Sequence, residues 1–281
     1  MSQNTLLQDS QCMHRKLAVV TGASSGIGLA YARYFAAQGY DLIITGRRKD
    51  ILFETAHEMQ RNYSVDVEVI IADLSKKQDI TKLLKALGHK IHIDVLVNNA
   101  GYSLNCAFTE DEFDHQIDMV KVHMNAPLLL IHSVLPGMIK NKKGIIINVS
   151  SLASAFPAAN NGMYSGTKSF VRVFTESLHM EVAGYGIKIQ CLCPGFTHSD
   201  FHRNSEVKDY IRPFFWMTPD QVVDYSIYCL KKGRVICIPG FLYRVINFIS
   251  KFIPRKIYYP LAHRMEKYFN PAKDKVKPAW Y

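Results

Sequence analysis

Short apolar runs recur along the first two thirds of the chain, and each is followed by a stretch whose apolar residues return at helical spacing. Five of these runs lie at residues 17–22, 41–46, 67–74, 93–101 and 144–151. Short, nearly continuous apolar runs that end in glycine or polar residues predict strands buried on both faces of a sheet. Strands that alternate with helices predict an α/β protein with a parallel, doubly wound sheet flanked by helices.

The 281 residues contain no repeat and no segment that resembles a linker between these runs, so they predict a single domain. We divide the chain into a polar N-terminal extension at 1–15, an α/β domain at 16–240 and a basic C-terminal extension at 241–281. The first fifteen residues lack the apolar segment of a signal peptide. A cytoplasmic location is therefore expected.

Six cysteines are present, and no two of them form a C-x-x-C pair. Cys191 and Cys193 alternate with an apolar residue in a strand pattern, so their side chains are expected on one face of a strand. We predict reduced thiols there, with no disulfide and no metal site. His198 and His202 lack carboxylate or cysteine partners at ligand spacing, which also argues against bound metal.

The C-terminal extension is basic and amphipathic. Residues 240–281 hold nine Lys or Arg and two acidic residues, a net charge of +7 out of the chain's +10. Apolar residues recur at helical spacing up to Pro254, over a length too short to span a bilayer. A basic amphipathic helix is typical of peripheral contact with an anionic membrane, here through 241–256. Alternatively, the apolar face packs on the domain or on a second subunit. Nucleic acid is a weaker explanation, because no recognition motif accompanies the charge.

A glycine-rich turn follows the first apolar run. Its residues are Gly22, Ala23, Ser24, Ser25, Gly26, Ile27 and Gly28. Glycines on a strand-to-helix turn let the backbone approach a pyrophosphate closely, and the helix N-terminus offers N–H donors to it. The turn therefore predicts a dinucleotide site.

The second apolar run ends at Gly46 and is followed by Arg47 and Arg48. Sites that bind NAD usually carry an acidic residue at this place, where it holds the ribose 2′-hydroxyl. Two guanidinium groups suit a 2′-phosphate instead, by charge and by their forked donors. Cations are also unfavourable at a helix start, which makes a purely structural role less convincing. We therefore expect NADPH as the cofactor.

Tyr164 and Lys168 are four residues apart, with Ser151 thirteen residues before Tyr164 at the end of an apolar run. Tyr and Lys at this spacing lie on one face of a helix. A neighbouring ammonium is expected to draw the pKa of a phenol toward working pH, so that Tyr164 can exchange a proton with a carbonyl oxygen. Ser151 can position the same oxygen, although Ser150 competes for this role. Tyr228 and Lys232 repeat the spacing without such a strand, and we interpret them as helix surface.

Taken together, these motifs resemble the short-chain dehydrogenase/reductase family, whose signatures occur here in order over about residues 15–240. The resemblance implies one Rossmann-type domain that transfers hydride between a nicotinamide cofactor and a carbonyl or alcohol. It implies that Lys168 holds the nicotinamide ribose and Tyr164 lies beside it. It also implies that Asn98 supports the central strands. Further cofactor contacts implied by it are Asp73, Leu74, Asn99, Ala100, Gly101, Pro194, Gly195 and Thr197.

One position departs from the family pattern. The family places a catalytic Asn thirteen residues before the proline of a Leu-Pro pair, and counting back from Pro136 reaches His123. A histidine there can carry a water-mediated proton relay to Lys168. Alternatively, only the backbone carbonyl matters and the side chain is tolerated. A third hypothesis is a local helix bulge that restores Asn125 to the site.

The segment 197–218 follows the sixth strand, where the family has its mobile lid. It contains Phe201, Tyr210, Phe214, Phe215, Trp216 and Met217 together with His198, His202, Arg203 and Arg212. Such a segment favours an apolar substrate, although its aromatic residues can equally pack the lid onto the domain. The tail resembles the 3-oxoacyl and 17β-hydroxysteroid-type branch of the family.

We therefore predict an NADPH-dependent reductase of a lipid-like ketone. The alternative is a catalytically weak NADPH-binding protein that senses or docks at membranes. The resemblance also implies a homodimer or homotetramer that pairs through helices within 112–140 and 160–184.

Overall fold

The computed structural model describes residues 15–90, 92–104, 106–202 and 211–269. Its strands begin within the apolar runs of the sequence and end where polar residues or glycine take over. They are β1 (Leu17–Thr21), β2 (Asp41–Gly46), β3 (Val67–Ile71), β4 (Val95–Asn98), β5 (Gly144–Val149), β6 (Ile187–Leu192) and β7 (Ile236–Cys237). The two-residue β7 has no apolar run long enough to predict it.

All seven strands are parallel and lie in the order β3-β2-β1-β4-β5-β6-β7. β1 pairs with β2 on one side and with β4 on the other, so the chain reverses its direction of travel across the sheet at β1. In open parallel sheets, ligands bind outside the carboxyl ends of the strands at such a switch point. The topology therefore places a ligand crevice beyond the ends of β1 and β4.

Helices follow most strands and cover both faces of the sheet. They are α1 (Gly26–Ala37), α2 (Lys49–Tyr63), α3 (Lys77–Gly88), α4 (Phe113–Val120), α5 (Ala126–Lys140), α6 (Gly162–Glu181), α7 (Pro219–Lys231), α8 (Phe241–Ser250) and α9 (Arg255–Phe269). A π-helical turn, η1 (Lys121–Asn125), joins α4 to α5. The loops within the described residues contain the 3-10 turns η2 (Leu152–Ser154), η3 (Asp200–His202) and η5 (Pro213–Phe215).

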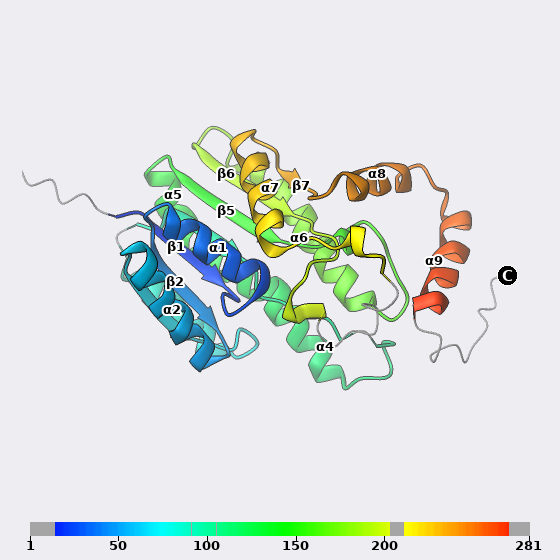
Figure 1. The fold of residues 1–281 in the computed structure, drawn as a ribbon, viewed down its shortest axis with the longest axis horizontal. Helices are drawn as coiled ribbons and strands as arrows, with labels where there is room; N and C mark the ends of the chain where they lie inside the picture. Colours follow the sequence, from blue (N-terminus) through cyan, green and yellow to red (C-terminus); the bar gives the residue numbers. More distant parts are fainter. Residues whose placement is uncertain (1–14, 91, 105, 203–210, 270–281) are drawn as a thin grey trace, which may run out of the picture.

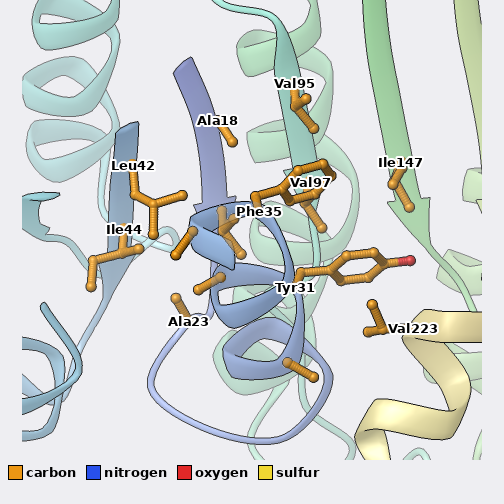
Figure 2. Close-up of a cluster of buried hydrophobic side chains, with 14 of the residues drawn as sticks. Ala18, Ala23, Tyr31, Phe35, Leu42, Ile44, Val95, Val97, Ile147 and Val223 are labelled. Carbon is orange, nitrogen blue, oxygen red and sulfur yellow. The ribbon is translucent and has the colours of Figure 1, made fainter. Parts of the chain in front are cut away.

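The core is two apolar layers, one on each face of the sheet. Alternate side chains of a strand point to opposite faces, so Val20 belongs to one layer and Val19 to the other. Tyr31 and Phe35 of α1 lie against the strands in the first layer (Figure 2). α1, α2 and α7 supply the helices of that layer, and α3, α5 and α6 supply those of the second (Figure 1).

The continuous helical run Phe113–Lys140, which comprises α4, η1 and α5, is long and apolar enough to cross a membrane by length and composition alone. Its Met119, Leu130 and Met138 are fully buried, and the last two lie in the second core layer. The apolar composition of this run is therefore explained in part by α5, which packs as a core helix against β4 and β5.

Candidate active site

The glycine-rich turn between β1 and α1 has no room for side chains at its glycines. Gly22 and Gly26 have φ values of +67° and +56°, which favour glycine. A Cβ on Gly28 would lie 2.2 Å from the Gly22 carbonyl oxygen. The first N–H groups of α1 have no acceptor within the helix. This bare backbone at a helix N-terminus fits the pyrophosphate of a dinucleotide.

Arg48 lies over this turn, at the end of β2. Its guanidinium donates hydrogen bonds to Ser24 Oγ and to Ser25 Oγ, the latter at 2.6 Å. It also pairs with Asp200 of η3 at 2.7 Å between Nη1 and Oδ2. Arg47 is exposed beside it. The Arg48 guanidinium thus links the glycine-rich turn to the segment after β6. The sequence alone did not indicate its contact with Asp200.

The loop after β4 is held directly against the glycine-rich turn. Asn99 donates from Nδ2 to the carbonyl oxygens of Thr21 and Gly22. The backbone N–H groups of Asn99 and Ala100 both donate to Thr21 Oγ1. Thr21, which directly precedes the glycine-rich turn, therefore organises the crevice, although it was not among the predicted cofactor contacts.

Side-chain hydrogen bonds also hold the ends of the neighbouring strands. Asn98 donates to Asn148 Oδ1 at 2.8 Å, which links β4 to β5. Asp73, just beyond β3, accepts from the backbone N–H and the hydroxyl of Ser75, and Leu74 is buried. All of these residues lie at the carboxyl edge of the sheet, where a dinucleotide is expected.

Tyr164 and Lys168 lie on α6 and face the end of β5. Lys168 Nζ donates to the Val149 carbonyl oxygen at 2.9 Å and lies 5.7 Å from the centre of the Tyr164 ring. The Ser150 hydroxyl donates to the backbone carbonyl oxygen of Lys168, so this hydroxyl serves to hold α6 against the end of β5. Ser151 hydrogen-bonds the Tyr164 hydroxyl instead. The geometry therefore favours Ser151 over Ser150 as the partner of Tyr164.

The proton affinities of this group follow mainly from burial. Desolvation raises the pKa of Tyr164 to about 12, and the hydrogen bond from Ser151 opposes the rise. Desolvation lowers the pKa of Lys168 to about 8. The expectation that the ammonium draws the pKa of Tyr164 downward is thus wrong for this arrangement, because burial of the phenol has the larger effect. Lys168 is itself buried, and its Nζ donates to the Val149 carbonyl oxygen.

Tyr228 and Lys232 behave as a helix surface. Tyr228 lies on α7 and is exposed, and Lys232 is exposed just after the same helix. Spacing alone therefore did not identify the acid/base pair; the preceding strand with its terminal serine did.

His123 is buried in η1 and bonded through both ring nitrogens. Nε2 accepts from the backbone N–H of Tyr102 at 3.1 Å, so the ring proton is on Nδ1, which donates to Thr167 Oγ1 at 2.9 Å. Thr167 in turn donates to the backbone oxygen of Tyr164. Burial, with a contribution from the charge of Lys168, holds the pKa of His123 well below its usual range. His123 is therefore a neutral bridge between the loop after β4 and α6.

This arrangement bears on the three hypotheses for His123. A neutral ring with both nitrogens occupied has no free atom for a proton relay. A helix bulge does occur, as η1, but it leaves Asn125 exposed and does not bring it to the site. The side chain is also more than tolerated, because it fills the space above Gly101, where a Cβ would lie 2.8 Å from Nε2.

The segment after β6 closes the other side of the crevice. The Pro194 carbonyl oxygen accepts from the N–H of Leu152, and Thr197 is buried with its hydroxyl on the Gly195 carbonyl oxygen. A Cβ on Gly195 would lie 2.2 Å from the ring of Tyr243, which comes from α8. Tyr243 was missed by sequence reasoning, because it belongs to the C-terminal extension.

Among the described residues of the lid segment, Phe201 lies at the site, with its ring 5.8 Å from that of Tyr164. Trp216 instead stacks on His198, and Phe215 packs on Tyr243. Tyr210 and Arg203 lie outside the described residues. A small hollow beside Tyr164 is lined by both apolar and polar side chains. Leu104, Phe108, Met119 and Met163 are on its apolar side, and its amides are Gln116, Asn160 and Asn161.

The cysteines and histidines of the described residues form no group of three that could hold a metal ion. Cys191 and Cys193 are both buried and free, with their sulfur atoms 3.6 Å apart on one face of the segment that ends β6. The predicted strand pattern of these two residues is therefore confirmed.

Comparison with known proteins identifies the family. The family model for short chain dehydrogenase matches residues 16–209. An uncharacterized oxidoreductase of Staphylococcus saprophyticus is 33% identical over 218 residues, which are 77% of this chain and 92% of that protein. The very-long-chain 3-oxoacyl-CoA reductase of Anas platyrhynchos is 36% identical over 193 residues, covering 67% of this chain and 62% of that one.

A solved structure with the same fold is a short-chain dehydrogenase from Sphingobium yanoikuyae in complex with NADPH, with a TM-score of 0.76 and 24% identity over 95% of this chain and 98% of that one. The family match covers the glycine-rich turn, the ends of β3, β4 and β5, and the group of Ser151, Tyr164 and Lys168. The chain therefore belongs to the short-chain dehydrogenase/reductase family, as an oxidoreductase that acts on a carbonyl or an alcohol with a nicotinamide cofactor.

Proposed function

We propose that this protein is an NADPH-dependent reductase of an apolar, lipid-like ketone, such as a 3-oxoacyl thioester or a steroid-like ring ketone. The observation that carries the proposal is the meeting of Ser151, Tyr164 and Lys168 at the carboxyl edge of the sheet, beside the bare turn of Gly22 to Gly28. Carbonyl reduction requires a proton donor, a group that positions the carbonyl oxygen and a dinucleotide site next to them. All three lie at this edge of the sheet.

When bound on this turn, the cofactor supplies hydride to the carbonyl carbon. Tyr164 is protonated near neutral pH, because its pKa is raised to about 12, and it donates its phenolic proton to the carbonyl oxygen. Ser151, bonded to the same hydroxyl, orients that oxygen. Lys168 donates to the Val149 carbonyl oxygen and is positively charged at pH values below its pKa of about 8. Its charge stabilises the alkoxide that develops on the substrate.

Two observations support the choice of cofactor and substrate. Arg48 presents a fixed guanidinium at the end of β2, beside Ser24 and Ser25, where a 2′-phosphate would lie. Apolar side chains, among them Leu104, Phe108 and Met163, line part of the hollow beside Tyr164, and Phe201 borders the tyrosine from the lid. The similarity to a very-long-chain 3-oxoacyl-CoA reductase points in the same direction.

Replacing Tyr164→Phe removes the proton donor and keeps the buried ring. We expect turnover to fall by about 10²–10⁴-fold, while binding of NADPH is little changed. The measurement is loss of NADPH absorbance with a panel of 3-oxoacyl thioesters, steroid ketones and aromatic aldehydes. Tyr228→Phe, on the exposed surface of α7, is the matched control and should leave turnover unchanged. Tight NADPH binding by a wild-type protein that turns over nothing in the panel would favour the alternative of a non-catalytic cofactor-binding protein.

Replacing Arg48→Ala tests the cofactor preference. Losing charge-assisted hydrogen bonds to a phosphate costs about 1.5–3 kcal/mol, so KM for NADPH should rise by about 10–100-fold. KM for NADH should change little, because NADH has no 2′-phosphate. Arg61→Ala, at the exposed end of α2, serves as control. An equal rise in KM for NADPH and NADH would show that Arg48 supports the glycine-rich turn and does not bind the 2′-phosphate.

A further inference from the structure

The helix α8 presents its apolar stripe away from the domain. Tyr243 and Asn247 are buried and face the body of the protein. Phe241 and Phe248 are seven residues apart, so they lie on one face of α8, opposite the buried pair. Phe252, just after the helix, lies with its ring 5.1 Å from that of Phe248. These three side chains are 74%, 62% and 70% exposed. A soluble helix that is packed on a domain normally buries such a stripe.

The exposure does not come from a detached helix. The Tyr243 hydroxyl accepts from the Phe196 N–H at 3.0 Å and donates to the Phe215 carbonyl oxygen at 2.6 Å. Further along, Tyr258 of α9 donates to the Pro157 carbonyl oxygen at 2.8 Å. α8 and α9 are thus attached to the domain, and they lie at the end of the molecule opposite α2 (Figure 1).

The chain after α8 adds further exposed apolar side chains and several cations. Ile257, Tyr259 and Leu261 are also exposed. Residues 241–264 contain five Lys or Arg and no Asp or Glu. Four of the five are exposed, and none forms an ion pair with another described residue; they are Lys251, Arg255, Lys256 and Arg264. We call residues 241–264 with this stripe and these cations the α8–α9 surface.

An exposed apolar patch of this kind marks a contact site. A second copy of the chain is a poor occupant, because a two-fold interface would bring the cations of two identical surfaces together and residues 241–264 supply no acidic residue to pair with them. Spanning a membrane is excluded for α8, whose ten residues are too few. Aromatic side chains amid lysine and arginine match the boundary between anionic headgroups and acyl chains.

We propose that the α8–α9 surface docks this protein on an anionic membrane. Phe241, Phe248 and Phe252 enter the headgroup–acyl boundary, while Lys251, Arg255 and the neighbouring cations contact lipid phosphates and carboxylates. The buried face of α8 stays on the domain through Tyr243, so docking requires no unfolding of the extension.

The test is co-sedimentation of the full chain with vesicles of phosphatidylcholine alone, or of equal parts phosphatidylcholine and phosphatidylserine. We expect binding to the anionic vesicles that weakens as salt is raised. Phe248→Ser with Phe252→Ser should lower the affinity by about tenfold or more, because it removes two inserted rings. The matched control is Ile51→Ser with Phe53→Ser, two exposed apolar residues of α2 at the other end of the molecule.

Charge reversal provides a second arm. Arg255→Glu with Lys256→Glu should abolish the preference for anionic vesicles, whereas Lys82→Glu with Lys85→Glu on the exposed face of α3 should not. Unchanged NADPH binding shows that each variant is folded. Equal sedimentation of wild type and the Phe248/Phe252 variant, or no sedimentation with either vesicle, would overturn the proposal; the second result would point to an acidic protein surface as the partner.

Discussion

The bonding of His123 fixes its protonation state through two neighbours from different parts of the chain. The backbone N–H of Tyr102 can only donate, which makes Nε2 an acceptor and leaves the proton on Nδ1 toward Thr167. Protonating Nε2 would break the bond to Tyr102 and place a second charge near Lys168. Both effects act in the direction of the lowered pKa of His123.

This state predicts a pH dependence of stability. A histidine whose pKa is lowered in the folded protein binds its proton more readily when unfolded, so its contribution is present above the ordinary pKa of about 6.5 and is lost as pH falls toward the native value. The free energy of unfolding should fall by up to about 1.4 kcal/mol for each pH unit below about 6.5 on account of His123 alone.

The measurement is denaturant unfolding of wild type and His123→Asn at several pH values between about 5 and 7.5. Asparagine keeps an acceptor and a donor but does not titrate, so the variant should show a shallower loss of stability on acidification. A parallel decline in the two proteins would mean that other groups account for the acid sensitivity and that His123 is not held neutral.

At the scale of elements, α8 belongs to the wall of the crevice as well as to the extension. Its Tyr243 packs on Gly195, bonds the N–H of Phe196 and reaches the Phe215 carbonyl oxygen. These contacts join the segment after β6 to the lid segment near η5. The aromatic residues of the lid thus have two roles, since Phe215 packs on α8 whereas Phe201 borders the Tyr164 ring.

Tyr243→Phe tests this link because it keeps the ring and removes the hydroxyl. Two polar backbone groups lose their partner, so we expect a loss of about 1–3 kcal/mol in the free energy of unfolding. We also expect a higher KM for NADPH, because the segment carrying Gly195 and Thr197 is held less firmly. Tyr258→Phe is the control: it removes one bond to Pro157 from a half-buried ring and should affect neither quantity as strongly. Similar losses in both variants would contradict a special role for Tyr243.

At the scale of the whole molecule, two further surfaces stand out besides the crevice. The α8–α9 surface lies at one end, and exposed apolar side chains also occur on α4, α5 and α6, at Phe113, Leu129, Val173 and Met180. The second group lies on the helices through which a dimer or tetramer is expected. Pairing through them remains a prediction.

The sequence by itself determined those features that depend on neighbouring residues. Strand and helix alternation follows from local apolar periodicity, and it predicted the parallel sheet and its single domain. The bare turn at Gly22, Gly26 and Gly28 follows from backbone conformations that other residues avoid. The face shared by Tyr164 and Lys168 follows from helical spacing, and the strand before them separated this pair from Tyr228 and Lys232.

Only the tertiary structure decided the features that join distant segments. Arg48 meets Asp200 across 152 positions, and Tyr243 reaches Phe196 across 47. The neutral state of His123 and the raised pKa of Tyr164 depend on burial, which no local pattern reports. Helical spacing likewise showed that α8 has an apolar face. Whether that face is buried depends on which side of the helix packs on the domain, and the side that packs carries Tyr243, so the apolar face is exposed.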